Sequence, residues 1–249
     1  MQTGTTTSTK LPRTAKTTAP KKRAPKKRAP KKRAPLTHER ILHTALRLAD
    51  KDGVESLSMR KLASALKVEA MSLYNHVGGK DDILDGLVEL VVAEFAVPVP
   101  ADDWRATMTT RAHVAHAALM RHPWATMLLL ARLNTGPKML RYVDATIGCL
   151  RAAGFSYPLA DHASSAVDAF IYGFTLQTLH FPLEPGAYAH AAQGFLPMLP
   201  VEQFPHLHGM ALEVIAGRHD GVQHLDHGLQ LLLDGFERLQ REASPSSTR

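Results

Sequence analysis

The stretch that follows Pro35 has the hydrophobic pattern of an amphipathic helix. In "LTHERILHTALRLADKDG" the apolar residues from Ile41 to Ala49 recur three and four positions apart, which is the spacing of one helix face. Thr37 is suited to cap the start of this helix, and Gly53 is suited to end it. We therefore expect a first helix between these two residues.

The next stretch, "SLSMRKLASALKVEAMSLYNHVGGKDDIL", predicts two shorter helices. One begins near Ser58, a turn covers residues 66–69, and the other helix runs from Ala70 to about His76. Ala63 is small where the helices would cross, and five apolar side chains can form a miniature core: Leu57, Leu62, Leu66, Val68 and Leu73. Two short helices joined by a tight turn form a helix-turn-helix, whose second helix would lie in the major groove of DNA.

Helical spacing also dominates the rest of the chain, and few segments alternate as strands do. The stretch "FPLEPGAYAHAAQGFLPMLPVEQFP" is rich in Pro and Gly, so we expect a loop with one short helix there. The fold class predicted is all-α. The expected helices cover residues 80–97, 102–121, 123–132, 137–153, 158–181, 201–216 and 222–241.

Charge is distributed unevenly along the chain. The 249 residues are 45% hydrophobic, enough for a sizeable core, and the net charge of +7 suggests a polyanionic partner. Residues 1–36, however, hold 12 of the 30 Lys and Arg residues and no Asp or Glu. Residues 37–249 carry 18 basic and 23 acidic residues, a net charge of −5. The basic character therefore belongs to the N-terminal segment alone.

In that segment the five-residue unit APKKR is repeated three times in succession, in "APKKRAPKKRAPKKRAPL". Proline at every fifth position and the scarcity of large apolar side chains predict disorder. The Lys and Arg triplets suit loose contact with phosphates, but no aromatic side chain is present to stack on bases. We expect the tail to raise DNA affinity without specifying sequence. A merely solubilising tail and contact with an anionic membrane surface are the alternatives.

Other kinds of chemistry have little support. The single cysteine, Cys149, excludes an internal disulfide framework and lies in an apolar helix, where we expect a buried thiol. No apolar run approaches the roughly 20 residues that span a bilayer. No secretory signal is recognisable at the N-terminus. We therefore expect no membrane partner and a cytoplasmic, nucleoid-associated location.

Metal binding and catalysis are not expected either. His113 and His116, like His224 and His227, lie three residues apart and can share a helix face. Apart from Asp226, neither pair has a cysteine or carboxylate in the same helix turn that could complete a metal site, so we interpret them as surface histidines. No catalytic or nucleotide-binding motif is present, so we predict neither an enzyme nor a cofactor.

The helix-turn-helix region resembles a known family. "SMRKLASALKVEAMSLYNHVGGKDDILDGL" strongly resembles the DNA-binding domain of TetR-family transcriptional repressors, and "LYNHVGGKDDIL" is the most specific part of the match. The resemblance covers residues 37 to about 95 well and continues more weakly, through "DDW" and "AAGFS", towards the tetracycline-repressor branch. Lys67 departs from the Gly usual in the turn. Since a left-handed Lys costs about 1 kcal/mol, we expect a slightly different turn.

The resemblance implies how the chain is divided. It implies an N-terminal three-helix helix-turn-helix DNA-binding domain (37–82) and a larger helical ligand-binding and dimerisation domain (83–242). Before them we expect the disordered basic tail (1–36), and after them a flexible C-terminus (243–249). Segments 158–181 and 222–241 would pair with their copies in a four-helix bundle, although both could instead be internal core.

The implied function is that of a ligand-responsive transcriptional regulator, a repressor, with activation as the alternative. It would bind a palindromic operator in double-stranded DNA as a homodimer, and a small-molecule effector would release it. One rival is a nucleoid-associated or architectural DNA-binding protein that acts mainly through its basic tail. Another is a helical ligand-binding or catalytic protein with a vestigial DNA-binding domain.

Candidate DNA contacts cluster around the second short helix. Met71 could meet a thymine methyl group, and Asn75 is suited to contact adenine. The resemblance implies phosphate contacts for Tyr74, His76 and Lys80, although the first two could instead pack the domain. The full set is Ser58, Arg60, Ala70, Met71, Ser72, Tyr74, Asn75, His76 and Lys80.

Candidate effector contacts come from the helices between residues 102 and 177. An apolar lining with a few polar groups is usual for such sites, and ordinary core packing is the alternative for each residue. The resemblance places metal-binding positions of the tetracycline repressor at Leu130 and Gln177, and a drug-contacting one near Ala96. We therefore predict no response to magnesium–tetracycline. The candidates are Met127, Leu130, Asn134, Met139, Thr146, Ile147, Phe170, Phe174 and Gln177.

Overall fold

A computed structural model of the protein describes residues 4, 5, 7, 35–101, 103–183, 186–219 and 224–243. Most of the basic tail and residues 244–249 are not among them, so the predicted disorder of the tail and of the C-terminal end lies outside the described residues. The described residues from Leu36 onwards form one compact unit by their contacts.

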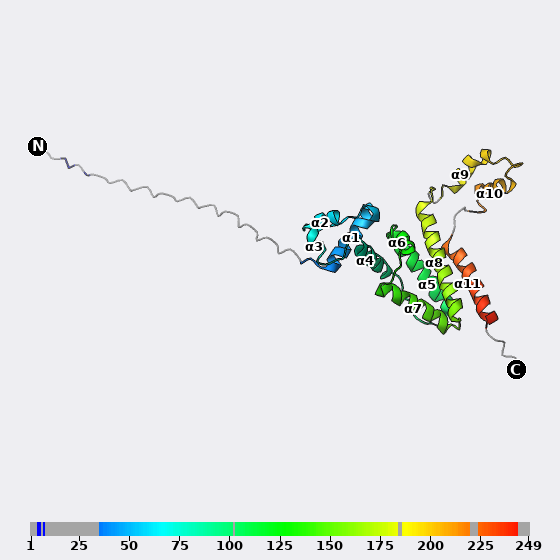
Figure 1. Ribbon diagram of the computed structural model, residues 1–249. Coiled ribbons are helices and arrows are strands. Elements are labelled where there is room, and N and C mark those ends of the chain that lie inside the picture. The colour runs from blue at the N-terminus through cyan, green and yellow to red at the C-terminus, as the bar shows by residue number, and fades with distance from the viewer. Residues whose placement is uncertain are drawn as a thin grey trace. The chain divides into compact units, whose positions relative to one another are not determined.

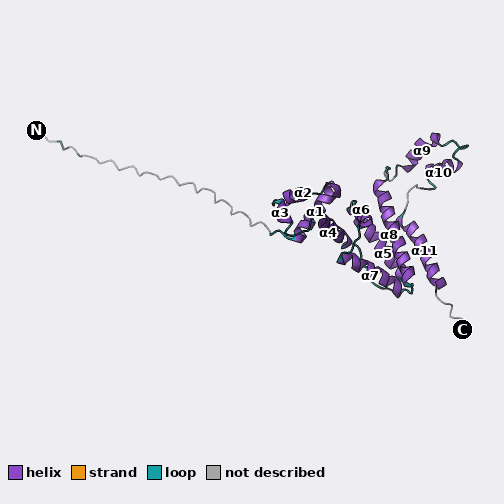
Figure 2. Ribbon diagram, viewed as in Figure 1, coloured by secondary structure: helices purple, strands orange, loops and turns teal. Residues whose placement is uncertain are grey.

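All regular secondary structure in the described ranges is helical, which confirms the predicted all-α class (Figure 2). None of these helices is both long and apolar enough to cross a bilayer. In chain order the elements are α1 (His38–Asp52), the 3-10 helix η1 (Val54–Ser56), α2 (Met59–Leu66), α3 (Ala70–Leu73), α4 (Lys80–Val92), α5 (Trp104–Arg121), α6 (Ala125–Ala131), α7 (Pro137–Ala152), α8 (Tyr157–His180), α9 (Tyr188–Phe195), η2 (Leu196–Met198), α10 (Pro205–Ile215) and α11 (Leu225–Ala243).

Helices α1 to α3 form a three-helix unit whose ends follow the sequence signals. The Oγ1 atom of Thr37 accepts a hydrogen bond from the Arg40 amide at 3.2 Å, and Gly53 ends α1 with φ of 79°. The expected miniature core is present, with Leu62 and Leu73 fully buried and Val68 packed at its margin.

The turn between α2 and α3 corrects one expectation. Lys67 adopts the left-handed conformation, with φ of 58° and ψ of 46°, and its amide donates to the carbonyls of Ala63 and Ser64. The Val68 amide also donates to Ala63, at 3.0 Å. These bonds satisfy the carbonyls at the end of α2. The expected change in turn shape was therefore wrong, because Lys67 takes the conformation that Gly would have taken.

The second short helix is shorter than predicted. Helix α3 ends at Leu73, and residues 74–76 continue as turns, in which the amides of His76 and Val77 both donate to the Leu73 carbonyl at 2.9 and 3.0 Å. Gly79 follows with φ of 146°, a value that favours glycine, and lets the chain reverse into α4. The predicted helix, which ended at about His76, was therefore three residues too long.

Helix α4 joins the N-terminal unit to the larger helical part (Figure 1). It packs against α1 on one side and against α6 and α7 on the other. A Cβ atom on Gly86 would stand 2.6 Å from the Cδ2 atom of Leu42, so glycine permits the close approach of α1. The chain leaves the helix after Val92, and Phe95 packs edge-on against Tyr142 with ring centroids 5.3 Å apart.

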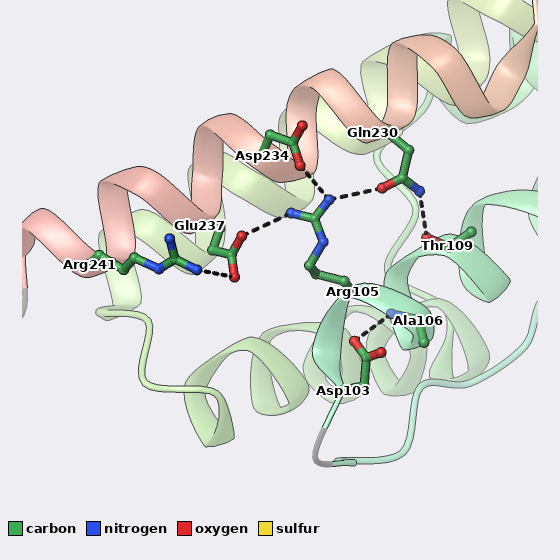
Figure 3. A network of polar contacts seen from close by, with 8 residues as sticks. All are labelled: Asp103, Arg105, Ala106, Thr109, Gln230, Asp234, Glu237 and Arg241. Carbon is green, nitrogen blue, oxygen red and sulfur yellow. Dashed lines mark hydrogen bonds and ion pairs between the residues drawn. The ribbon is translucent and has the colours of Figure 1, made fainter.

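The larger part is built on α5, α8 and α11, with α7 also packed on α8 (Figure 1). Arg105 of α5 holds α11 by polar contacts: it donates to Gln230 at 2.9 Å, to Asp234 at 2.5 Å and to Glu237 at 3.3 Å (Figure 3). Helix α9 is the short helix expected within residues 181–205, where η2 follows it, and α9 packs on α10.

Candidate nucleic-acid interface and effector cavity

The predicted recognition segment exposes side chains that a folded domain normally buries. Met71 is 75% exposed and Tyr74 is 50% exposed, while Leu73 between them is fully buried. Buried Leu73 thus anchors α3 to the domain, and its neighbours face outwards. Exposed large apolar side chains at the surface of a small domain are characteristic of a contact surface.

The other predicted DNA contacts divide into exposed and structural residues. Asn75 and His76 are exposed, and Ser72 is half-buried. Ala70 packs against the core. The Oγ atom of Ser58 accepts a hydrogen bond from the Lys61 amide at 3.2 Å and so caps α2. Ala70 and Ser58 therefore also serve the fold, and the DNA contacts of all nine residues stay predictions.

Two basic side chains near this segment are available for phosphates. Within the described part of the chain, neither Arg60 nor Lys80 is held in an ion pair, and both are exposed. Lys61 is instead held by Asp52, with 2.7 Å between Nζ and Oδ2. The Lys61 hydrogen bond lowers the pKa of Asp52. Arg60 opens α2 and Lys80 opens α4, so the free cations lie on the helices that flank α3.

The N-terminal unit is joined to the larger part by a buried histidine. The Nδ1 atom of His122 lies 2.7 Å from Oδ1 of Asp50 in α1, and its Nε2 atom lies 3.1 Å from Oε1 of Glu94, just after α4. Trp124 donates to the same Asp50 oxygen at 2.8 Å. The end of α5 and the start of α6 are thus tied to α1.

Helix α4 is tied to α6 and α7 in a similar way. The Glu89 carboxylate accepts hydrogen bonds from the amides of Lys138 at 2.8 Å and Met139 at 3.1 Å, so it caps the start of α7. Arg132 donates to Asp85 at 2.8 Å and to Asp81 at 3.1 Å. Any displacement of α4 along its axis has to break these contacts.

A cavity of about 370 Å³ lies between the segment after α4 and the first turns of α5. Its volume falls at the lower end of the range for small-molecule sites. The lining is mostly apolar, and its polar residues are Asp103, Thr107, Thr110 and Arg111. The lining residues are Ala96, Val97, Pro98, Val99, Ala101, Asp103, Ala106, Thr107, Thr110 and Arg111.

None of the nine predicted effector contacts lines this cavity. Met127, Leu130 and Gln177 are exposed, Met139 and Thr146 are buried, and the other four are half-buried. The Thr146 hydroxyl donates to a carbonyl of its own helix, Tyr142, at 2.8 Å. Their effector roles stay predictions. The cavity wall instead includes Ala96, the position implied by the resemblance for a drug contact.

A buried polar cluster was missed in the sequence. Arg111 of α5 is 1% exposed and forms an ion pair with Asp168 of α8, and its Cζ atom lies 4.8 Å from the ring centroid of Tyr142. Among the residues that the structure describes, the Nε and Nη1 atoms of Arg111 and the hydroxyl of Tyr142 are buried without a hydrogen-bond partner. A signal was present, because Arg111 falls at helical spacing between the buried Met108 and Ala115.

Burial sets the electrostatics of this cluster. It raises the pKa of Asp168, although Arg111 opposes the shift, and it raises the pKa values of Tyr142 and Tyr172. Burial alone would lower the pKa of Arg111, but Asp168 and then Tyr142 together outweigh it and leave that pKa raised. Both tyrosines therefore stay protonated, and Arg111 stays charged.

The histidine pair in α5 does not act as a unit. His113 Nε2 lies 2.6 Å from Asp226 Oδ1, whereas His116 Nδ1 lies 2.8 Å from Thr175 Oγ1. Burial, and then the neighbouring His113, lower the pKa of His116. In the ranges that the structure describes, no three His, Cys, Asp or Glu side chains gather as a metal site would require. Cys149 is buried, as expected, and burial raises the pKa of its thiol.

Known proteins match both parts of the chain. A family model described as "Tetracyclin repressor-like, C-terminal domain" matches residues 97–239, and one described as "Bacterial regulatory proteins, tetR family" matches residues 41–87. An HTH-type transcriptional regulator of Saccharopolyspora erythraea is 38% identical over 139 residues, which cover 55% of this chain and 59% of that protein. The chain thus spans about three fifths of that relative.

Two further matches extend over most of the chain. The tetracycline repressor protein class D of Escherichia coli is 30% identical over 207 residues, covering 81% of this chain and 89% of the repressor. The crystal structure of the Streptomyces coelicolor TetR family protein ActR in complex with actinorhodin has a TM-score of 0.71 and 29% identity, covering 83% of this chain and 99% of that one. The matched families and relatives are transcriptional regulators and not enzymes. The chain therefore belongs to the TetR family of DNA-binding transcriptional regulators.

Proposed function

We propose that this regulator is a repressor that binds a palindromic operator as a homodimer and leaves it when a small molecule binds. Helices α1 to α3 would contact DNA, and helices α5 to α11 would bind the effector and the second subunit. Helix α4 would connect these two parts. The observation that carries the proposal is the outward-facing pair Met71 and Tyr74 on a segment anchored by Leu73. One short helix reads too few base pairs alone, and a two-fold dimer reads two half-sites.

Helices α8 and α11 support a dimer. On α8, Ser165, Ala169 and Gly173 are exposed four residues apart, and on α11 Leu231 and Leu239 are exposed. Small side chains on one helix and leucines on its neighbour permit close helix packing. Both helices also pack on each other within the subunit, so they would supply one continuous surface to the partner.

The contacts of α4 support effector control. His122 and Arg132 tie the helices of the larger part to α1 and α4, so a ligand that favours another arrangement of α5 to α7 would shift the DNA-binding helices as well. Such a ligand must bind the two arrangements with different affinity. ActR is a relative whose structure contains actinorhodin. We infer that the effector here is not magnesium–tetracycline, since Leu130 and Gln177 lack the metal-binding chemistry that the resemblance requires there.

The test is selection from random double-stranded DNA with the full-length protein at moderate salt. Enrichment of an inverted repeat of short half-sites is the expected result. Enrichment of nothing beyond base composition would contradict the proposal and favour an architectural protein that acts through its basic tail. The selected operator would then serve to find the effector by release of bound DNA.

A further inference from the structure

Lys67 occupies a backbone position for which lysine is poorly suited. In the described part of the chain it is the one residue other than glycine with a positive φ, 58°. A residue with a Cβ atom is strained in this left-handed region, which glycine and asparagine adopt more readily. Strained residues of this kind cluster at functional sites. The presence of lysine here therefore needs a reason other than the shape of the turn.

The Lys67 side chain adds nothing to the turn between α2 and α3. Backbone bonds hold this turn: the Lys67 amide donates to the carbonyls of Ala63 and Ser64, and the Val68 amide donates to Ala63. Glycine at position 67 would form the same bonds. Within the ranges that the structure describes, the exposed Lys67 ammonium has no hydrogen bond or ion pair, not even with the exposed Glu69. The ammonium is therefore left for a partner outside the chain.

The position of Lys67 makes the DNA backbone the partner that fits. The turn leads directly from α2 into α3, which begins at Ala70 (Figure 1). Phosphates border the major groove on both sides of any segment that enters it. Lysine carries its charge and three donors on a long flexible stem, which suits it to bind phosphate.

The charge of the DNA-binding unit gives such a contact weight. Residues 37–82 carry seven basic and seven acidic residues, so the unit has little net attraction for DNA. Lys61 is held by Asp52 at 2.7 Å. Each cation without a carboxylate partner, Lys67 among them, therefore supplies a larger share of the affinity for phosphate.

We propose that Lys67 contacts a phosphate of the DNA backbone and that this contact offsets the strain of the left-handed turn. The inference rests on the proposed function, since it adds a contact to the complex of this regulator with its operator. Phosphate contacts carry no sequence information, so Lys67 raises affinity for every DNA. Because the glycine usual at this position of the family has no side chain, the contact belongs to chains with a cation there.

Two measurements on Lys67→Gly test the proposal. The midpoint of thermal unfolding should rise by about 2–4 °C, because glycine relieves the strain. Binding to a duplex with the selected operator, followed by fluorescence anisotropy, should weaken by about three- to ten-fold at low salt. The slope of the logarithm of the binding constant against the logarithm of the salt concentration should fall by about one. A purely structural residue would leave this slope unchanged, and an unchanged slope overturns the proposal.

Three further variants separate the charge of Lys67 from the shape of the turn. Lys67→Asn removes the charge with a residue that tolerates the left-handed conformation, and it should lower the slope as glycine does. Lys67→Arg keeps the charge and should keep the natural slope. The matched control is Lys138→Gln, since Lys138 is exposed in the first turn of α7 and its loss changes the net charge equally. A natural slope in Lys67→Asn, or an equal fall in Lys138→Gln, overturns the contact.

The two proposals fail in different ways. If the protein selects an inverted repeat but Lys67→Gly keeps the natural salt slope, the contact is wrong and the regulatory function stands. If the protein selects no operator, the proposed function fails, and the same titrations on a random duplex still decide whether Lys67 contacts phosphate.

Discussion

The Nδ1 atom of His122 lies 2.7 Å from the Oδ1 atom of Asp50 and thereby joins the end of α5 to α1, the first helix of the N-terminal three-helix unit. The other ring nitrogen lies 3.1 Å from Glu94, which also accepts from Arg121. Burial would raise the pKa of Glu94, but the hydrogen bonds from Arg121 and His122 outweigh it and leave that pKa below its ordinary value of 4.5. The carboxylate form is thus the one that the fold stabilises.

The first prediction concerns stability in acid. Because the pKa of Glu94 is lower in the folded chain, its stabilising effect is fully present above pH 4.5 and is lost as the pH falls through the lowered folded value. We expect Glu94→Gln to be less stable than the natural chain at pH 7 and the difference to shrink towards pH 3. Urea unfolding across this range measures it.

The control for this prediction is Glu39→Gln, since the Glu39 side chain is 83% exposed and forms only a weak contact with His43 at 3.8 Å. Its effect should be small at every pH. A difference between Glu94→Gln and the natural chain that does not change with pH would contradict the role given to Glu94.

The second prediction concerns the cap of α7. A Cβ atom on Gly136 would collide with the Glu89 carboxylate, which caps α7 through the amides of Lys138 and Met139. Gly136→Ala should therefore destabilise the chain by about 1–2 kcal/mol, the usual effect of losing a cap. A thermal melt would show a midpoint lower by about 2–8 °C.

A matched glycine provides the control. Gly148 lies inside α7 with no atom within 4 Å of a built Cβ. Gly148→Ala should raise stability by up to about 1 kcal/mol, because alanine is the better helix former. Equal effects of the two substitutions would mean that the Glu89 cap contributes nothing.

The third prediction concerns the proposed dimer. Gly173 of α8 and Gly148 of α7 both have open space around a built Cβ, but only Gly173 lies on the proposed subunit interface. We expect Gly173→Glu to dissociate the dimer, because it would place a charge between closely packed helices, and Gly148→Glu to leave it intact. Sedimentation equilibrium distinguishes them. A dimer that survives Gly173→Glu would place the interface elsewhere.

The sequence predicts most of this fold because helical periodicity and capping residues are local. Thr37 and Gly53 mark the ends of α1 as expected, and the long helices lie within a few residues of their predicted bounds. The end of α3 was missed because it depends on how Leu73 accepts two hydrogen bonds, which no spacing reveals. Lys67 was misjudged because the hydrogen bonds of the turn outweigh the unfavourable conformation of one residue.

The site was less predictable, for a related reason. Exposed residues of the recognition segment can be proposed from a short local motif, whereas the Arg111–Asp168 and His122–Asp50 pairs join residues far apart in the chain. An isolated Arg in an apolar helix indicates burial but not its partner. The apolar candidates for the effector site could not be distinguished from ordinary core, since both have the same composition.

The fourth prediction separates base contacts from phosphate contacts. Asn75 and Lys80 are both exposed. Only the side-chain amide of Asn75 can both donate a hydrogen bond to an adenine base and accept one from it. Asn75→Ala should weaken binding to the selected operator by about 1–3 kcal/mol and relax the preference at one position of each half-site. Lys80→Ala should weaken binding to all sequences alike. It should also reduce, by about one, the slope of the logarithm of the binding constant against the logarithm of the salt concentration. The affinities of both variants for operators with single base changes measure these effects. If Lys80→Ala relaxed the base preference and Asn75→Ala weakened binding to all sequences alike, the two roles would be exchanged.

The fifth prediction concerns the basic tail. Residues 1–36 carry 12 basic residues and no acidic one, whereas residues 37–82 carry seven of each sign, so the helix-turn-helix has little net attraction for a polyanion. We expect deletion of residues 1–36 to weaken binding to every DNA and to flatten its dependence on salt, because fewer counterions are released. The preferred sequence should not change, since the tail has no aromatic or fixed group with which to read bases.

Repeating the selection with the shortened chain, and titrating operator and random DNA at several salt concentrations, measures both effects. A changed preferred sequence would mean that the tail takes part in recognition, and an unchanged salt slope would mean that it does not contact DNA.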